Sequence, residues 1–152
     1  TGGRLRRALA HIHDDTFLFT YGDGVTDANL NGAVEFHRSH GAIATVTAVK
    51  PTGRFGELAM DGKTITAFRE KPEQESAYIS GGFMVLNRRV GEYLEGGDQC
   101  IFERGPMERL AREGQLKAFA HDGFWQCMDT LRDKTLLDDL WASGRAPWKV
   151  WP

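Results

Sequence analysis

The sequence has few cysteines and little excess of charge of either sign. Cys100 and Cys127 are its two cysteines, and they do not form a CxxC pair. Without a disulfide framework or a zinc-binding spacing, the chain is expected to work in a reducing compartment, the cytoplasm. The formal net charge is -2, which argues against the broad basic surface that binds nucleic acid or an anionic membrane. We therefore expect small molecules as ligands, with no nucleic acid and no membrane as partner.

The sequence also has no hydrophobic run of membrane-spanning length, and it does not begin with methionine. It opens with TGGRLRRALAHI, which predicts a helix and no strand before it. Its 152 residues are enough for one domain-sized core. We expect a fragment, in which residues 1–152 are the C-terminal portion of a single longer domain.

Alternating strand and helix patterns predict an α/β fold with a mixed, mostly parallel sheet flanked by helices. Strands are expected over residues 17–22, 42–49, 78–87 and 115–122, with a hairpin around Asp61-Gly62. Helices are expected over residues 2–14, 26–41, 88–95, 106–113 and 131–144. Asp27 is the expected N-cap of the second helix, and Gly41 is its expected end.

Two aspartates each follow a strand-like run, Asp23 after FLFTYG and Asp129 after GFWQCM. If both strands lie in one sheet and run in the same direction, both carboxylates reach the edge where α/β sheets bind ligands. Such a pair suits Mg²⁺ beside substrate phosphates. Each aspartate alone also has a simpler interpretation: Asp23 as a turn residue, and Asp129 or its neighbour Thr130 as a helix cap. Together, Asp23 and Asp129 are predicted to bind the metal.

Three further motifs supply candidate substrate contacts. In FREKP, Glu70 would accept hydrogen bonds from sugar hydroxyls and Lys71 would bind a phosphate. Alternatively, the two residues form an ordinary surface ion pair. Gly81-Gly82 in ISGGF leave space for a sugar ring, or they mark a β-bulge. Arg4 follows a Gly-Gly step at a helix start, where it would clamp a phosphate or be one of several surface arginines.

The tail, residues 145–152, carries Trp148 and Trp151 after the last expected helix. It has too few polar residues for a free linker. We expect this Trp-rich tail to dock on this domain, on a part outside this sequence, or on another subunit of a homo-oligomer.

The motifs TGGRL, FLFTYGDGV, GRFGEL, FREKP, ISGGFMVLN and GFWQCMDTLRDK follow one another in this order. In this series the chain resembles the sugar-1-phosphate nucleotidylyltransferases, and most closely their cytidylyltransferase branch. The resemblance implies the nucleotide-diphospho-sugar transferase type of fold. It also implies Mg²⁺-dependent transfer from CTP to glucose 1-phosphate, which yields CDP-glucose and pyrophosphate for a bacterial surface polysaccharide such as O-antigen.

The resemblance also assigns roles to residues. It places Asp23 and Asp129 at metal-binding, catalytic positions, with Lys71 as the third catalytic residue. The residues predicted to contact substrate are Arg4, Gly22, Glu70, Lys71, Gly81 and Thr130. The family's Gly-rich loop with an arginine, followed by a lysine, is absent from this sequence. We therefore expect an N-terminal nucleotide-binding part outside it.

Three alternatives stay open at this point. The first is a relative that makes a dTDP- or UDP-sugar, and the second is a non-catalytic fragment that binds a sugar phosphate. The third is a metal-dependent glycosyltransferase, which also places aspartates at strand ends to hold a nucleotide sugar.

Overall fold

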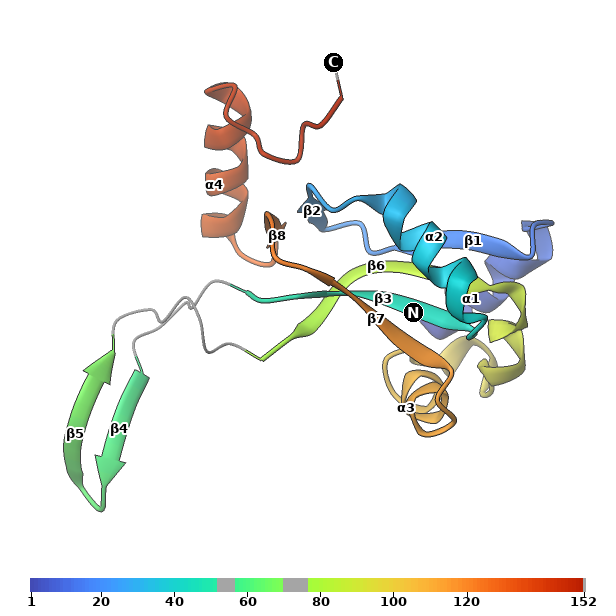
Figure 1. Cartoon of the computed structure of the whole chain (residues 1–152), viewed down its shortest axis with the longest axis horizontal. Helices are drawn as coiled ribbons and strands as arrows, with labels where there is room; N and C mark the ends of the chain where they lie inside the picture. Colours follow the sequence, from blue (N-terminus) through green and yellow to red (C-terminus); the bar gives the residue numbers. More distant parts are fainter. Residues whose placement is uncertain (52–56, 70–76, 152) are drawn as a thin grey trace.

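The structure is a computed structural model that describes residues 1–51, 57–69 and 77–151. Its main sheet has four strands, which lie side by side in the order β1 (Thr16–Thr20), β6 (Ile79–Asn87), β3 (Ala44–Val49) and β7 (Leu116–His121) (Figure 1). Strands β1, β3 and β7 run in one direction, and β6 runs in the opposite direction between β1 and β3. The predicted mixed sheet is confirmed. Most of its strands share one direction, although only β3 and β7 are parallel neighbours.

Helices cover both faces of this sheet. They are α1 (Gly2–Ala8), α2 (Leu30–His40) and α3 (Gly105–Arg112), with the 3₁₀ turns η1 (Leu9–His11), η2 (Arg88–Tyr93) and η3 (Gly97–Gln99), whereas α4 (Leu131–Ala142) lies away from the sheet (Figure 1). Thr45 of β3 points toward α2, whereas its neighbours Ala44 and Val46 join a core cluster with Leu110 of α3. Because side chains alternate along a strand, α2 and α3 lie on opposite faces. None of the helices in the described ranges has the length and apolar composition needed to cross a bilayer.

The hydrophobic core fills the space between the sheet and the layer of α1, α3, η2 and η3. Its buried side chains are Leu5, Ile43, Ala44, Val46, Met84, Leu86, Val90, Tyr93, Leu94, Cys100, Phe102 and Leu110. Strand β3, with the sequence ATVTAV, is buried along its whole length. This is expected for a central strand that helices cover on both faces.

Two shorter sheets lie outside the main one. Strand β2 (Gly24–Thr26) pairs antiparallel with β8 (Trp125–Cys127), and we call this pair the ribbon. Strands β4 (Glu57–Asp61) and β5 (Thr64–Arg69) form the predicted hairpin, with Gly62 at a φ of 60° in its turn. In Figure 1 this hairpin and α4 extend away from the main sheet, and the ribbon lies between α4 and the sheet.

The first two helices differ from their predicted extent. The first ends as an α-helix at Ala8 and continues as η1, because Ile12 already has extended backbone angles. The second begins at Leu30 and not near Asp27, because the side chain of Asn29 caps it by accepting from the N–H of Gly32 at 2.9 Å. Its predicted end is confirmed, since Gly41 adopts the left-handed conformation that closes many helices.

A polar network is buried between α2 and β3. The hydroxyl of Thr45 lies 2.9 Å from Nδ1 of His37 and 2.8 Å from Nε2 of His40, and the N–H of Ala42 donates to Nδ1 of His40 at 3.0 Å. With its Nδ1 accepting, neutral His40 carries its proton on Nε2 and donates to Thr45, which in turn donates to His37. Burial is the main cause that lowers the pKa of both imidazoles. The network therefore requires two neutral histidines.

We predict that the folded protein loses stability as the pH falls from about 7.5 to about 5.5. Both histidines have a folded pKa below the usual value of about 6.5, so the unfolded chain takes up more protons in this range. Urea unfolding at the two pH values measures the loss. His40→Gln should reduce the loss of stability between the two pH values. His13→Gln, at an exposed position, is the control and should leave this loss unchanged. Equal unfolding midpoints at both pH values would contradict this role of the network.

Candidate active site

A cavity of about 410 Å³ opens at the carboxyl end of β1. Three segments supply its lining: the start of α1, the end of β1 with the loop that follows, and the loop before α3. The lining residues are Thr1, Arg4, Phe19, Thr20, Tyr21, Gly22, Asp23 and Glu103. Three of the residues predicted from sequence, Arg4, Gly22 and Asp23, therefore share one cavity. We call it the site cavity.

The carboxylate of Glu103 connects two of these segments. Hydroxyl groups of Tyr21 and Thr1 both donate to it, and Thr1 accepts in turn from the N–H of Phe102 at 2.9 Å. The pKa of Tyr21 is raised well above its usual range, by burial first and then by its bond to Glu103. Burial, the largest influence, would raise the pKa of Glu103, but several favourable contacts, first those of the Thr1 and Tyr21 hydroxyls, together lower it. Glu103 is thus an anion and Tyr21 a neutral donor at neutral pH.

The Gly-Gly step at the start of α1 serves close packing. A Cβ at Gly2 would lie 2.4 Å from Sγ of Cys100, and one at Gly3 would lie 2.6 Å from the carbonyl oxygen of Asp98. The N–H of Gly3 donates to the carbonyl of Cys100 at 3.1 Å. The N–H of Gly3 is therefore used within the fold and is not available to an anion. Arg4 itself is exposed and lines the site cavity.

Asp23 and Asp129 lie at the same end of the ribbon. Asp23 directly precedes β2. On the other strand, β8 ends at Cys127, and Met128 and then Asp129 follow it. The N–H of Met128 donates to the carbonyl of Asp23 at 2.7 Å, which extends the ladder to this end. The sequence argument placed both aspartates after parallel strands of one sheet. The structure brings them together differently, because the start of one antiparallel strand meets the end of its partner.

Thr130, and not Asp129, caps α4. Its hydroxyl accepts from the N–H of Asp133 at 3.2 Å, and its own N–H donates to the Asp133 carboxylate at 3.0 Å, which completes a capping box. The carboxylate of Asp129 accepts from the thiol of Cys127 at 3.2 Å. Substrate binding by Thr130 stays a prediction, although the cap already uses both its hydroxyl and its N–H.

Gly81 and Gly82 form a β-bulge in β6. The register against β3 shifts between Val46 and Ala48, and Gly82 has a φ of 77°. A Cβ at Gly81 would lie 3.3 Å from the indole nitrogen of Trp125, and one at Gly82 would lie 2.8 Å from the ring of Tyr21. The bulge interpretation is therefore confirmed. Contact between Gly81 and a sugar stays a prediction. Binding of a sugar phosphate by Glu70 and Lys71 also stays a prediction, because both residues lie outside the described ranges.

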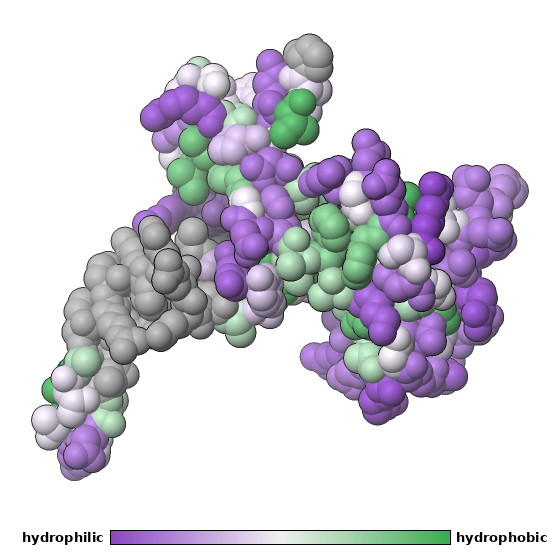
Figure 2. Space-filling view, viewed as in Figure 1, coloured by the Kyte–Doolittle hydropathy of each residue, from purple (hydrophilic) through white to green (hydrophobic). Residues whose placement is uncertain are grey.

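Trp148 of the tail packs on the domain. Its ring stacks against Phe124 and Trp141, at centroid distances of 5.4 and 6.5 Å. Trp151 differs, because 53% of its surface is exposed. Figure 2 shows apolar surface at this end of the chain, next to α4. Trp148 thus packs on this domain and Trp151 is exposed, and docking of the tail as a unit stays a prediction.

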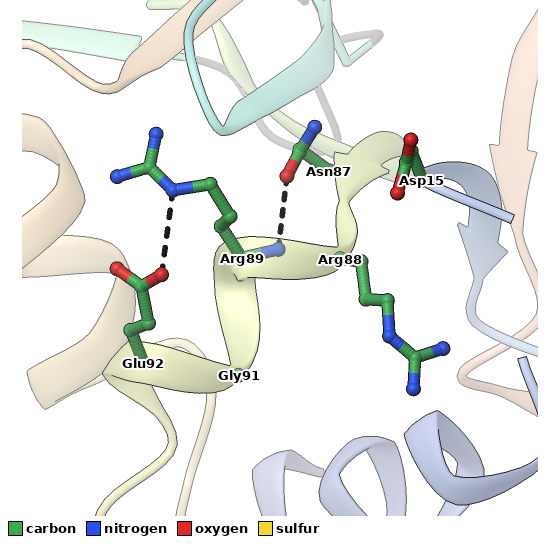
Figure 3. Close-up of a pocket in the computed structure, with 6 residues that line it drawn as sticks. All are labelled: Asp15, Asn87, Arg88, Arg89, Gly91 and Glu92. Carbon is green, nitrogen blue, oxygen red and sulfur yellow. Dashed lines mark hydrogen bonds and ion pairs between the residues drawn. The ribbon is translucent and has the colours of Figure 1, made fainter. Parts of the chain in front are cut away.

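A second cavity, of about 600 Å³, lies at the opposite end of β1. Figure 3 shows its lining residues, Asp15, Asn87, Arg88, Arg89, Gly91 and Glu92. Arg89 is engaged by Glu92, with 3.3 Å between Nε and the carboxylate, and its N–H donates to Asn87 at 2.9 Å. No candidate residue from the sequence lies here. The site cavity therefore remains the candidate active site.

Sequence reasoning did not identify Thr1, Tyr21 or Glu103 as site residues. Tyr21 stands in the stretch FLFTYGDGV, but it was interpreted there as part of a buried strand. Glu103 lies 82 positions after Tyr21, in a segment without a recognisable motif. No local pattern indicates that these two side chains meet.

Residues 4–129 match the family described as Nucleotidyl transferase, and the chain belongs to this family. It is 49% identical over 152 residues to the glucose-1-phosphate cytidylyltransferase of Salmonella typhi. It is 38% identical over 151 residues to the probable glucose-1-phosphate cytidylyltransferase of Bacillus subtilis. Each match covers 99% of this chain and 59% of the relative, so the chain spans about three fifths of their length.

Solved structures share the fold. HddC from Yersinia pseudotuberculosis matches with a TM-score of 0.68 and 21% identity, over 93% of this chain and 62% of that chain. A putative glucose-1-phosphate thymidylyltransferase from Bacillus anthracis matches with a TM-score of 0.65 and 19% identity, over 95% and 61% of the two chains. These likenesses confirm the predicted α/β class, a mixed sheet flanked by helices.

We predict that Tyr21 and Glu103 stabilise the fold as a coupled pair. Tyr21→Phe and Glu103→Ala should each lower the free energy of unfolding, with a coupling of about 1 kcal/mol in a double-mutant cycle. Urea unfolding of the parent, the single variants and the double variant measures this coupling. As a matched control, Tyr21→Phe should be additive with Glu113→Ala, because Glu113 accepts from Tyr93 instead. Additivity in both cycles would show that the bond to Glu103 contributes nothing.

Proposed function

We propose that the protein containing this chain transfers a cytidylyl group from CTP to glucose 1-phosphate, forming CDP-glucose and pyrophosphate. Membership of the nucleotidyl transferase family supports the class of reaction. The names of the two cytidylyltransferase relatives support the choice of substrates. Because this chain spans 59% of those relatives, the proposal concerns the protein at its full length.

The single observation that carries the proposal is the position of the two aspartates. Asp23 lines the site cavity together with Arg4, and Asp129 lies at the same end of the ribbon as Asp23. The site cavity thus presents a guanidinium, which binds phosphates, beside the carboxylate of Asp23. The carboxylate of Asp129, outside the lining but at the same end of the ribbon, would complete a pair suited to a divalent cation. A substrate that carries both phosphate and metal fits this combination.

The proposed step requires no covalent intermediate on the protein. A phosphate oxygen of glucose 1-phosphate attacks the α-phosphorus of CTP, the bond from that phosphorus to the bridging oxygen breaks, and pyrophosphate leaves. The chain contributes by holding both substrates in line. In this assignment Arg4 binds phosphate at the site cavity, Lys71 holds the attacking phosphate, and Glu70 accepts from sugar hydroxyls. Gly22 and Gly81 would let the substrate approach the backbone closely.

Asp23 and Asp129 are the proposed ligands of Mg²⁺. Among the described residues, no cluster of three or more histidine, cysteine or acidic side chains is placed to hold a metal. Two carboxylates nevertheless suit Mg²⁺, which takes its remaining ligands from substrate phosphates and water. When bound, the ion would offset the negative charge on the phosphoryl oxygens. The two aspartates would fix its place at their end of the ribbon.

The proposed setting is the cytoplasm, with small molecules as substrates and a homo-oligomer as the assembled form. The two cysteines, Cys100 and Cys127, have neither the spacing of a disulfide framework nor that of a zinc site, which supports a reducing compartment. The exposed Trp151 supports an oligomer, because large aromatic side chains are enriched at protein interfaces.

We predict that Asp129→Asn lowers turnover by about a hundredfold or more, because a neutral amide would no longer hold the ion that offsets charge in the transition state. The measurement is pyrophosphate release from CTP with glucose 1-phosphate, using the longest open reading frame that contains this chain. Asp14→Asn, at an exposed position outside the site, is the control and should keep full turnover.

Two other results of this assay would reject the proposal. Near-normal turnover of Asp129→Asn with unchanged Mg²⁺ dependence would remove the metal assignment. Release of a nucleoside diphosphate from a nucleotide sugar, without pyrophosphate, would instead identify a glycosyltransferase. Running CTP, UTP, dTTP and GTP in parallel tests the choice of base.

A further inference from the structure

The ribbon is too short to hold its own position. Each of its strands has three residues, and the ladder joins Gly24 with Cys127, Val25 with Gln126 and Thr26 with Trp125. An isolated two-stranded pair of this size is marginal in water. The place of Asp23 and Asp129 therefore depends on contacts that attach the ribbon to the rest of the fold.

The end of the ribbon opposite the aspartates is attached to the main sheet. His121 is the last residue of β7, and its Nε2 lies 2.9 Å from Oδ1 of Asp27, the residue that follows β2. The same Nε2 lies 3.2 Å from the carbonyl of Phe124, which also accepts from the hydroxyl of Thr26 at 2.8 Å. One imidazole thus faces both strands of the ribbon where they leave the ladder.

This contact is largely shielded from water. The His121 side chain is 13% exposed, and Oδ1 of Asp27 is inaccessible to solvent. Among the described residues, no hydrogen bond reaches that oxygen, and the imidazole at 2.9 Å is the polar group that faces it. A buried oxygen that loses its polar neighbour is costly, so the contact favours one arrangement of the ribbon relative to β7.

Gly123 keeps the space in which the two side chains meet. A Cβ at this position would lie 2.6 Å from Cε1 of His121 and 2.7 Å from Oδ1 of Asp27. Gly123 is not in the left-handed region, so its role here is one of space and not of backbone conformation. An alanine would push between the imidazole and the carboxylate.

The middle of the ribbon has a second attachment. The indole N–H of Trp125 donates to the carbonyl of Gly81 at 2.8 Å, in the bulge of β6. This bond limits sideways movement of β8. It does not limit rotation of the ribbon about that point, which the contact between His121 and Asp27 opposes.

We propose that His121 and Asp27, with the space kept by Gly123, anchor the far end of the ribbon to β7 and thereby set the position of Asp23 and Asp129. His121 and Asp27 are positioning residues: they act through the ribbon and not on the substrate. The inference rests on the proposed function for the metal itself, but the anchoring is a property of the fold alone.

The test compares His121→Leu, which removes the donor, with His121→Gln, whose amide nitrogen can take the place of Nε2. It uses the longest open reading frame that contains this chain. Hydrogen exchange over residues 124–130, which include the N–H of Met128, should be about fivefold faster in His121→Leu and within about twofold of the parent in His121→Gln. Exchange over β1 should not change in either variant.

The variants that speed hydrogen exchange over residues 124–130 should also weaken metal binding. The dissociation constant of Mn²⁺, measured by water-proton relaxation, should rise about fivefold in His121→Leu and be restored in His121→Gln. The KM for glucose 1-phosphate at saturating metal should stay within about twofold. Gly123→Ala should reproduce His121→Leu, and Gly105→Ala, where an added Cβ meets no atom within 4 Å, should behave as the parent.

The two proposals fail in different ways. Unchanged exchange over residues 124–130 in His121→Leu would overturn the anchoring, and so would equal effects of Leu and Gln. Full Mn²⁺ affinity in Asp23→Asn would instead overturn the metal assignment of the proposed function. Faster exchange over β1 as well as the ribbon would reduce His121 to a general contributor to stability and overturn the positioning role.

Discussion

The backbone pairing of β2 with β8 is the constraint on which the candidate site depends. It joins segments about a hundred positions apart, as the bond between Thr26 and Phe124 across 98 positions shows. Because the strands are antiparallel, the residue before β2 and the residues after β8 reach the same end. Asp23 and Asp129 are neighbours for this reason, and the bond from Met128 to Asp23 holds that end closed.

The bulge in β6 connects the ribbon and the site cavity to the main sheet. The absence of a side chain at Gly82 lets the ring of Tyr21 pack closely, and Tyr21 then donates to Glu103. The carbonyl of Gly81 accepts from Trp125 of the ribbon. Two adjacent glycines thus help to place both an aromatic side chain of the cavity and the strand that leads to Asp129. This role in packing explains why a strand interior tolerates them.

Local patterns predicted most of the fold. The run AIATVTAV over residues 42–49 indicated a strand, Asp61-Gly62 indicated the hairpin, and Gly41 indicated the end of α2. Such signals depend on residues within one turn or one strand of each other. The N-cap of α2 was mispredicted, because Asp27 and Asn29 are both good cap residues. In the structure Asn29 caps the helix, and the carboxylate of Asp27 faces His121, far along the chain.

By itself, the sequence determined the α/β class and the order of most elements, because side-chain periodicity and turn residues act locally. Its motifs also offered Arg4 and Asp23 as candidates, and the family resemblance added Gly22. Tertiary structure alone decided that Glu103 meets Tyr21 and that His121 faces Asp27. It also decided how Asp23 and Asp129 come together, through an antiparallel ribbon and not through one parallel sheet. These contacts join residues whose separation along the chain carries no periodic signal, so only strand pairing and packing in three dimensions could select them.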